Sequence, residues 1–313
     1  MSKVEHFISV HDLTREEVNR LFDLAVKVKA DPGAYRSALA GKTLGMIFQK
    51  SSTRTRVSFE AGMVQLGGHA LFLSSRDIQL GRGEPISDTA QVLSRYLDGV
   101  MARTFAHQDV VDLARYGTIP VINGLTDELH PCQVMADFLT LREAFGTLDG
   151  RKIAYVGDGN NMAHSLMFGA AKVGMDIAIA APEGYQPAAR YVALARADHA
   201  AAGTTVTITD DPRQAVEGAS CVYTDVWASM GQEEESEKRL QAFAGWTVDE
   251  AMMARAADDA VFLHCLPAHR GEEVAAEVID GPRSRVVDEA ENRLHAQKAI
   301  LLWLMGGPAF AIR

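Results

Sequence analysis

Hydroxyl and cationic side chains are concentrated in one short stretch of this chain. The apolar run from Leu44 to Phe48 is typical of a buried strand, and a helical pattern starts a few residues later. The polar groups at this junction are three hydroxyls and three cations: Ser52, Thr53, Thr55, Lys50, Arg54 and Arg56. A strand that leads directly into a helix leaves unpaired backbone N–H groups at the helix start, where the helix dipole favours an anion. The stretch predicts a site for a phosphate dianion, with an ordinary helix cap beside exposed arginines as the alternative.

More polar groups follow the later strands that we expect in the first half. Arg103 comes just after the strand expected at 98–102, which places another guanidinium at a strand end. His130 precedes Pro131 at the start of a predicted helix, and Gln133 follows within one turn, so the side chains of His130 and Gln133 can face the same ligand. A polar helix cap is the alternative interpretation of His130.

Loops with amide, acid and hydroxyl groups follow strands of the second half. The turn from Gly157 to Asn161 has a Gly-x-Gly pattern but lacks the third glycine of the dinucleotide fingerprint, so it is weak evidence for a nicotinamide cofactor. Its two amides, at a helix start, suit a carboxylate or amide ligand. Asp225 and Ser229, four residues apart at a strand exit, suit an ammonium group.

Cys265 ends a hydrophobic strand next to His264. Adjacent residues on a strand point to opposite faces, so His264 is badly placed to activate the thiol for covalent catalysis. A buried and inert cysteine is the simpler interpretation. We also expect no metal site, because no pair of His, Cys or Asp residues has ligand spacing that a second pair supports.

Strand-like and helix-like segments alternate along the chain, which predicts parallel sheets flanked by helices, an α/β fold. A capping box at Thr14–Glu17 opens the first amphipathic helix. Strands are expected at 43–48, 70–73, 98–102, 119–122, 152–156, 176–180, 204–208, 220–224, 260–263 and 285–288. Further helices are expected at 54–66, 86–96, 108–115, 132–145, 162–173, 187–200, 235–243, 272–279 and 291–304.

The length of 313 residues favours two domains. The polar, glycine-containing loop 146–150 is the best boundary, giving a first domain at 1–148 and a second at 149–289. The final residues, about 290–313, form a helix that we expect to return to the first domain. Ligands of open α/β sheets bind beyond the carboxyl ends of the strands, where the polar loops lie.

Composition excludes several classes of protein. No apolar run approaches the ~20 residues that span a bilayer, and the first residues lack the pattern of a signal peptide. Three cysteines, odd in number and far apart, argue against a disulfide framework and for a reducing, cytoplasmic location. A net charge of −10 makes nucleic-acid binding improbable and means that an anion must be captured by a local cluster of cations.

Five motifs, in this order and over nearly the whole chain, resemble those of the aspartate/ornithine carbamoyltransferase family. They are Ser52-Thr53-Arg54-Thr55-Arg56, His130-Pro131-Cys132-Gln133, Asp225-Val226-Trp227-Ala228-Ser229-Met230-Gly231, His264-Cys265-Leu266-Pro267 and Glu291-Asn292-Arg293. The third and fourth motifs are those of the ornithine-specific members. The resemblance implies transfer of a carbamoyl group from carbamoyl phosphate to the δ-amine of L-ornithine, without metal or organic cofactor. It also implies an active site in the cleft between the two domains.

The resemblance assigns a role to each motif residue. The phosphate would be bound by Ser52, Thr53, Arg54, Thr55 and Arg103. The carbamoyl end would be held by His130, Gln133 and Arg293, with Arg54 helping to polarise the carbonyl. The ornithine α-groups would be bound by Asn161, Asp225, Ser229 and Met230, with Cys265 and the Leu266 carbonyl near the δ-nitrogen. Gln79 would reach carbamoyl phosphate in a neighbouring subunit, which implies a homotrimer with shared sites.

Two alternatives to this function remain open. The acceptor could instead be aspartate, an acetylated ornithine or putrescine, although Asp225 would repel another carboxylate and calls for a free α-ammonium. A catalytically silent trimer partner or an amino-acid-binding protein on the same scaffold is the alternative from another class. Whether the reaction serves arginine biosynthesis or runs backwards in arginine breakdown does not follow from the residues.

Overall fold

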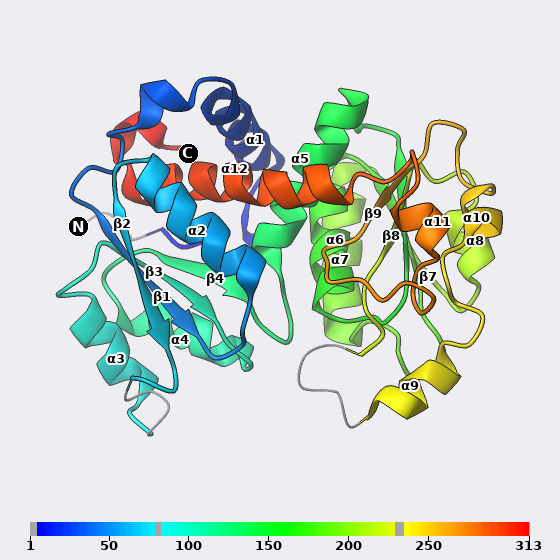
Figure 1. The fold of residues 1–313 in the computed structure, drawn as a ribbon, viewed down its shortest axis with the longest axis horizontal. Coiled ribbons are helices and arrows are strands. Elements are labelled where there is room, and N and C mark those ends of the chain that lie inside the picture. The colour runs from blue at the N-terminus through cyan, green and yellow to red at the C-terminus, as the bar shows by residue number, and fades with distance from the viewer. Residues whose placement is uncertain (1–4, 79–82, 229–234, 313) are drawn as a thin grey trace. The chain divides into compact units, whose positions relative to one another are not determined.

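The computed structural model describes residues 5–78, 83–228 and 235–312. It divides into two compact units (Figure 1). The first comprises Met1–Ala136 and Glu291–Arg313, and the second comprises Asp137–Ala290. The boundary expected at residue 148 follows helix α5, Pro131–Phe145, whereas the division of the chain between the two units falls within that helix, after Ala136. Each unit is described by itself.

The first unit is built on a four-stranded parallel sheet with strand order β2-β1-β3-β4. The strands are β1 Thr43–Phe48, β2 His69–Ser74, β3 Gly99–Arg103 and β4 Val121–Leu125. β1 lies between β2 and β3, and Phe48 at its end pairs with Ser74 on one side and Arg103 on the other. The carboxyl ends of these strands therefore place the turn after β1 next to Arg103, as parallel pairing requires.

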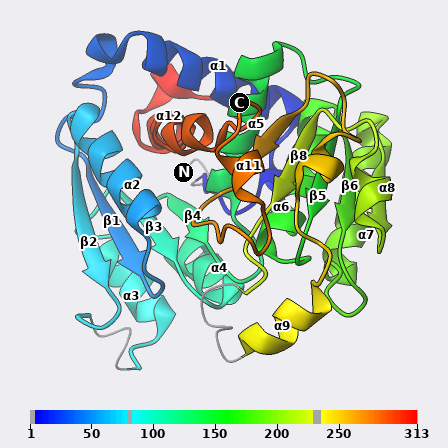
Figure 2. The same ribbon diagram turned by 45° about the vertical axis from the view of Figure 1, so that its right-hand side comes forward.

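Helices cover both faces of this sheet. On one face lie α1 Arg15–Ala30, α2 Thr53–Gln65 and the later part of α12, Val286–Met305; on the other lie α3 Ile86–Leu93 and α4 His107–Tyr116 (Figure 2). Short 3₁₀ turns occur at Val10–Asp12, Pro32–Tyr35 and Pro308–Phe310. The predicted capping box is present, because Thr14 and Glu17 exchange side-chain hydrogen bonds with each other's backbone N–H groups. The indole of Trp303 donates to Glu5 at 2.7 Å, which fixes the end of α12 in this unit.

The second unit contains a five-stranded parallel sheet with strand order β7-β6-β5-β8-β9. The strands are β5 Lys152–Val156, β6 Asp176–Ala180, β7 Val206–Thr209, β8 Cys221–Thr224 and β9 Val261–Leu263. From β5 the chain proceeds first to β6 and β7 and then returns to β8 on the other side. The strand order therefore reverses between β5 and β8, where open α/β sheets bind their ligands.

The helices of the second unit are short except for α6 and α7. They are α6 Asn161–Val173, α7 Ala189–Ala202, α8 Pro212–Val216, α9 Ser236–Ala242, α10 Glu250–Met253 and α11 Ala276–Ile279. α8, α10 and α11 pack on one face of the sheet through a core that includes Val156, Val222 and Phe262. Among the described residues, no helix is both long and apolar enough to cross a membrane.

The predicted strand at 285–288 is wrong. α12 begins at Val286, and the chain just before it makes only an isolated bridge between Ser284 and Phe262 of β9. The apolar pair Val286-Val287 suggested a strand, but Asp288 and Glu289 follow in the first turn of the helix, where the helix dipole favours acids. The helix predicted at 272–279 is also shorter than expected, and only Ala276–Ile279 is helical.

Candidate active site

Ser52 caps helix α2 at the end of the turn that follows β1. Its hydroxyl accepts a hydrogen bond from the backbone N–H of Thr55 at 3.2 Å. The helix start therefore has the cap that the sequence allowed, and it also presents the N–H groups and positive dipole end that favour an anion. The Thr55 side chain is buried, whereas Thr53 is exposed.

Arg293 of α12 joins residues from three helices of the first unit. Its Nη1 donates to Gln133 Oε1 at 2.6 Å, and its Nη2 donates to Thr55 Oγ1 at 3.1 Å. Its Nε donates to Gln297 Oε1 at 3.1 Å. Since the guanidinium is planar and only 2% exposed, these three acceptors fix its orientation. Arg293, Gln133 and Thr55, far apart in the sequence, are thus brought together as predicted partners of one ligand.

His130 is buried among cations. Burial lowers its pKa well below the ordinary value of 6.5, and the charges of Arg293, Arg103 and Arg54 lower the pKa further. The imidazole is therefore neutral at neutral pH, and one ring nitrogen can donate a proton in a hydrogen bond. A neutral donor beside three guanidiniums is suited to an anion with a carbonyl oxygen. The first-unit residues predicted to bind carbamoyl phosphate, other than Gln79, therefore lie in one region.

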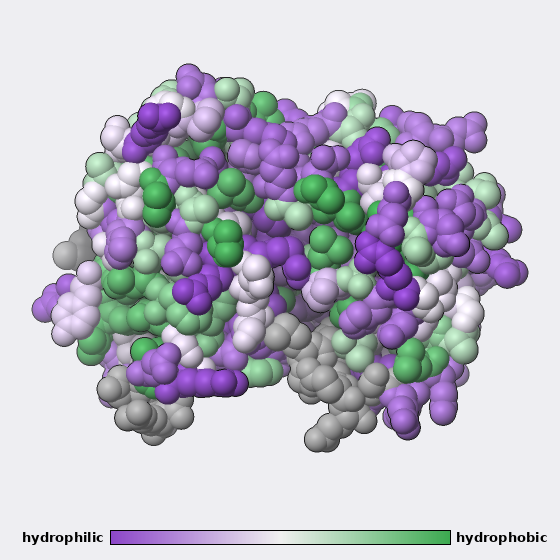
Figure 3. Space-filling view, viewed as in Figure 1, coloured by the Kyte–Doolittle hydropathy of each residue, from purple (hydrophilic) through white to green (hydrophobic). Residues whose placement is uncertain are grey.

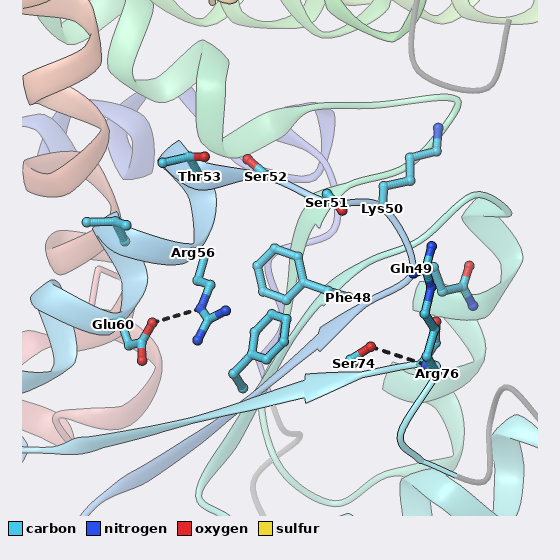
Figure 4. A pocket seen from close by; sticks show the side chains of 13 residues that line it. Phe48, Gln49, Lys50, Ser51, Ser52, Thr53, Arg56, Glu60, Ser74 and Arg76 are labelled. Atoms are coloured by element: carbon cyan, nitrogen blue, oxygen red, sulfur yellow. Dashed lines mark hydrogen bonds and ion pairs between the residues drawn. The ribbon is translucent and has the colours of Figure 1, made fainter. Parts of the chain in front are cut away.

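A pocket of about 630 Å³ opens beside the same turn. It is lined by Phe48, Gln49, Lys50, Ser51, Ser52, Thr53, Arg56, Val57, Glu60, Phe72, Ser74, Ser75 and Arg76. Figure 4 shows Arg56 directed away from Ser52 and towards Glu60. Its guanidinium lies 3.8 Å from the centre of the Phe72 ring, and its Nε donates to Glu60 at 3.2 Å. Lys50 forms an ion pair with Asp127. Arg54 is therefore the cation of this turn whose charge acts on His130.

Asp225, after the end of β8, is the centre of a second polar group. Its Oδ1 accepts from the Cys265 thiol at 3.1 Å and from the Val226 N–H at 2.8 Å. Its Oδ2 accepts from the Asn160 amide at 3.1 Å. Asn160 also caps α6, so the side chain that contacts Asp225 belongs to the residue before the predicted Asn161, which is the first residue of the helix. This group lies at the switch point between β5 and β8.

The Cys265 thiol acts as a donor. Burial and the charges of Asp225 and Glu289 raise its pKa well above 9.0, so it stays protonated at neutral pH. His264 is engaged elsewhere: its Nδ1 accepts from the Leu266 N–H at 2.8 Å, and its Nε2 lies 3.1 Å from Glu273. These contacts argue against nucleophilic catalysis by Cys265, in agreement with the sequence interpretation.

Leu266 is the one non-glycine residue with a positive φ among the described residues, at 57°. Its hydrogen bond to His264 helps to hold this unfavourable backbone conformation. Ligand-type atoms of Asp225, His264 and Cys265 lie within 4.8 Å of one another, as do those of His269, Glu272 and Glu273. However, both ring nitrogens of His264 are used in the contacts above and the Cys265 thiol is protonated, so the first trio does not favour a metal ion.

Arg239 was not predicted as a site residue. Its Nη1 donates to Asp158 at 2.8 Å and to the Trp227 carbonyl at 2.8 Å, and its Nε donates to Glu235 at 3.3 Å. Burial raises the pKa of Asp158 to about 6, while Arg239 opposes that rise. In the sequence Arg239 belongs to a charged run typical of an exposed helix, so no local signal indicates its burial. Three predicted residues, Gln79, Ser229 and Met230, lie outside the described residues.

Two family models match consecutive parts of the chain. The model described as "Aspartate/ornithine carbamoyltransferase, carbamoyl-P binding domain" matches residues 5–143, and the one described as "Aspartate/ornithine carbamoyltransferase, Asp/Orn binding domain" matches 149–304. The chain belongs to the aspartate/ornithine carbamoyltransferase family. The resemblance drawn from the five motifs is thus confirmed.

Relatives within this family are similar over almost their whole length. An ornithine carbamoyltransferase of Symbiobacterium thermophilum is 61% identical over 305 residues, covering 97% of this chain and 98% of the relative. The solved ornithine carbamoyltransferase of Pyrococcus furiosus is 52% identical with a TM-score of 0.94, covering 97% of this chain and 98% of that chain. An anabolic ornithine carbamoyltransferase of Campylobacter jejuni is 40% identical with a TM-score of 0.91, covering 96% and 99%. The predicted fold class, two parallel sheets flanked by helices, is confirmed.

Proposed function

We propose that this chain transfers the carbamoyl group of carbamoyl phosphate to the δ-amine of L-ornithine, giving L-citrulline and phosphate. The observation that carries the proposal is the group formed by Arg54, Arg103 and Arg293 around the buried, neutral His130 at the start of α2. In a chain with a net charge of −10, this local concentration of cations suits a doubly charged acyl phosphate. The relatives that match over the whole chain are named ornithine carbamoyltransferases.

Carbamoyl phosphate would bind with its phosphate at the start of α2. Ser52, Thr53, Arg54, Thr55 and Arg103 supply hydroxyls, backbone donors and guanidiniums to the phosphate oxygens. The carbamoyl carbonyl would then lie beside His130 and Arg54, with Gln133 and Arg293 around it. Attack on this carbonyl creates a tetrahedral oxyanion, and donors that are already fixed in place stabilise it without reorganisation. The bonds among Arg293, Gln133 and Thr55 provide that fixed arrangement.

Ornithine would bind in the second unit. Asp225 offers a carboxylate to the α-ammonium, and Asn161, Ser229 and Met230 would complete the contacts to the α-groups. Cys265 and the Leu266 carbonyl would orient the δ-nitrogen. That nitrogen must be neutral to attack. The new N–C bond forms first and gives the tetrahedral oxyanion, the C–O bond to phosphate then breaks as the oxyanion collapses, and the departing phosphate can accept the proton. The active site shared by the two domains remains a prediction.

We also propose a homotrimer in the cytoplasm. Four apolar side chains are well exposed on α2 and the edge strand β2: Val57 at 56%, Val64 at 66%, Leu71 at 40% and Phe72 at 38%. Figure 3 shows apolar side chains gathered over this part of the first unit. A group of exposed apolar residues on an edge strand and its neighbouring helix favours contact with another subunit. Gln79 would reach carbamoyl phosphate in the neighbouring subunit. All three cysteines are free, which suits a reducing compartment.

The direct test is citrulline formation from carbamoyl phosphate and ornithine. We expect activity in the wild type and a loss of at least about a hundredfold in Arg54→Ala, since one charged donor to the developing oxyanion is removed. A wild type as inactive as Arg54→Ala would refute the proposal and favour an amino-acid-binding protein. Equal rates with putrescine or N-acetylornithine would refute the assignment of ornithine. kcat/KM for ornithine should rise between about pH 6 and pH 9 as the δ-amine loses its proton.

The pathway is arginine biosynthesis, or arginine breakdown if the reaction runs in reverse. Saturation with carbamoyl phosphate tests whether assembly regulates the enzyme: a sigmoidal curve indicates such regulation, and a hyperbolic curve argues against it.

A further inference from the structure

Two acidic side chains meet in the interior of the second unit. Asp137 of α5 is 0% exposed and Glu289 of α12 is 1% exposed, and a hydrogen bond joins their side chains. Two ionised carboxylates have only acceptor oxygens and cannot form such a bond. One of the pair must therefore carry a proton, as in other carboxyl pairs that share a site.

The neighbours of Glu289 indicate which residue holds that proton. Glu289 Oε1 accepts from the Tyr223 hydroxyl at 3.2 Å, and its Oε2 accepts from the backbone N–H of His264 at 3.0 Å. Both oxygens of Glu289 thus accept hydrogen bonds, as a carboxylate does. This arrangement favours Asp137 as the protonated member of the pair, with Glu289 as the acceptor.

The bond from the His264 N–H places this pair at the base of the Cys265 segment. The segment continues with Leu266, whose N–H returns to the His264 ring at 2.8 Å. Glu289 thereby holds His264, the first residue of a short turn whose next residue, Cys265, donates to Asp225. The titratable groups that act on the pair or respond to it are Tyr223, Cys221 and Cys265.

The charge of the pair supports this arrangement. Burial and Asp137 raise the pKa of Glu289 well above 4.5, although the hydrogen bonds from His264 and Tyr223 lower it, so the pair as a whole holds a proton more tightly than a free carboxyl group. Asp137 and Glu289 are also among the charges that raise the pKa values of Cys265 and Tyr223. A single negative charge on the pair keeps the Cys265 thiol and the Tyr223 hydroxyl protonated. It also avoids two ionised carboxylates that would repel each other in the core.

We propose that Asp137 is a positioning residue that holds a proton at neutral pH, so that Glu289 remains an ionised acceptor and fixes His264, Cys265 and Leu266 for the ornithine δ-nitrogen. The location of ornithine in this statement rests on the proposed function. The presence of the proton on Asp137 does not depend on the proposed function. Asp137 acts through Glu289 and does not touch substrate.

Three variants test the proposal against a surface control. Asp137→Asn keeps a donor of the same shape that cannot ionise, and Asp137→Ala removes the donor. Glu289→Gln replaces one acceptor oxygen of Glu289 with an amide NH₂ group, which donates instead of accepting. We expect Asp137→Ala and Glu289→Gln to raise the KM for ornithine about tenfold or more, from the loss of one buried hydrogen bond, with the KM for carbamoyl phosphate within about twofold. Asp137→Asn should have a KM for ornithine much closer to that of the wild type than to that of Asp137→Ala. Asp288→Asn, the exposed neighbour of Glu289, is the control.

The pattern among the variants decides the outcome. If Asp137→Asn were as impaired as Asp137→Ala, Asp137 would have to be ionised and the proposal would be overturned. Equal effects on both KM values would likewise overturn it, because they indicate a general loss of structure. Thermal unfolding of each variant establishes that it is folded. Ornithine affinity from calorimetry supplies the same comparison if a variant does not turn over.

Infrared difference spectroscopy detects the proton without any assay of activity. The wild type at pH 8 should show the C=O band of a protonated carboxyl that is missing in Asp137→Asn. Asp158, whose pKa is raised to about 6, is ionised at pH 8 and does not contribute. Absence of the band overturns the proposal whatever reaction the protein catalyses. A band in a protein that neither binds ornithine nor forms citrulline refutes the proposed function and the positioning role, while the shared proton stands.

Discussion

Replacement of Arg293 by lysine tests whether geometry, rather than charge alone, organises the proposed carbamoyl phosphate site. The substitution keeps the positive charge beside His130 but removes the planar guanidinium. Arg293 now donates in three directions, to Gln133, Thr55 and Gln297. A lysine ammonium is a single point on a flexible stem, so it can reach one of these acceptors and must release the others.

The size of the effect follows from the bonds that are lost. A hydrogen bond from a charged donor contributes roughly 1.5–3 kcal/mol, and we take the lower value because relaxation and water compensate in part. Loss of two bonds costs about 3 kcal/mol, which corresponds to about a hundredfold in rate if the full cost is felt in the transition state. We therefore expect kcat/KM to fall about a hundredfold in Arg293→Lys.

Citrulline formation with each substrate varied in turn measures this loss. Because Arg293 is buried, thermal unfolding must show that the variant is folded at the assay temperature. Arg115→Lys is the matched control, since Arg115 lies exposed on α4 of the same unit and contacts the ring of Tyr116. A value of kcat/KM for Arg293→Lys within about fivefold of the wild type would show that charge alone suffices and would refute the reasoning.

Three further predictions concern the two units separately. Burial raises the pKa of Asp158 from 3.8 to about 6, so the stabilisation of its protonated form is complete below pH 3.8 and is lost as pH rises through about 6. The unfolding free energy of the wild type minus that of Asp158→Asn should therefore fall by about 3 kcal/mol between pH 3.8 and pH values above about 6. Denaturant titrations at a series of pH values measure this difference. A difference that does not change with pH would contradict the conclusion that burial raises the pKa of Asp158. The pKa of His130 lies well below 6.5, so NMR of labelled histidine should find a neutral ring at pH 6.5. The contribution of His130 to the unfolding free energy should decline as the pH falls below 6.5. A half-protonated ring at pH 6.5 would contradict the effect of burial and of the neighbouring arginines on this pKa. In Gly159→Ala the new Cβ would clash with the backbone nitrogen of Pro187 and displace the turn before α6. The KM for ornithine should then rise about tenfold, while the affinity for carbamoyl phosphate, measured by calorimetry, stays the same. An unchanged KM for ornithine in this variant would show that ornithine binds elsewhere.

Strand ends and helix starts could be predicted because their signals are local. The run from Leu44 to Phe48, the hydroxyl cap at Ser52 and the helix that follows appear where the sequence places them. Parallel pairing then brings Arg103 beside this turn without any further information. The same local signals failed at 285–288, where two valines resemble a strand but the acids after them begin a helix.

Burial of charged groups could not be predicted from the chain. Arg239 and Asp158 lie in segments that read as exposed, and their pairing depends on packing between α9 and the loop after β5. Asp137 and Glu289 each resemble an ordinary helical acid, and only the approach of α5 to α12 makes them a pair. The choice of Asn160 rather than Asn161 as the partner of Asp225 likewise depends on which amide caps α6. Long-range packing determines all three of these contacts, and a local sequence pattern carries no signal for it.

The return of α12 to the first unit sets the order in which the chain can fold during its synthesis. The second unit is one continuous segment from Asp137 to Ala290, whereas the first needs residues from both sides of it. At about 5–20 residues per second, the ribosome needs roughly 8–30 s to synthesise that segment, and during this time the first sheet lacks Arg293 and Trp303. The second unit can therefore be complete before Arg293 is available to donate to Thr55 in the turn proposed to bind phosphate. The residues proposed to bind carbamoyl phosphate are thus assembled at the end of translation, although most of them are synthesised at the beginning.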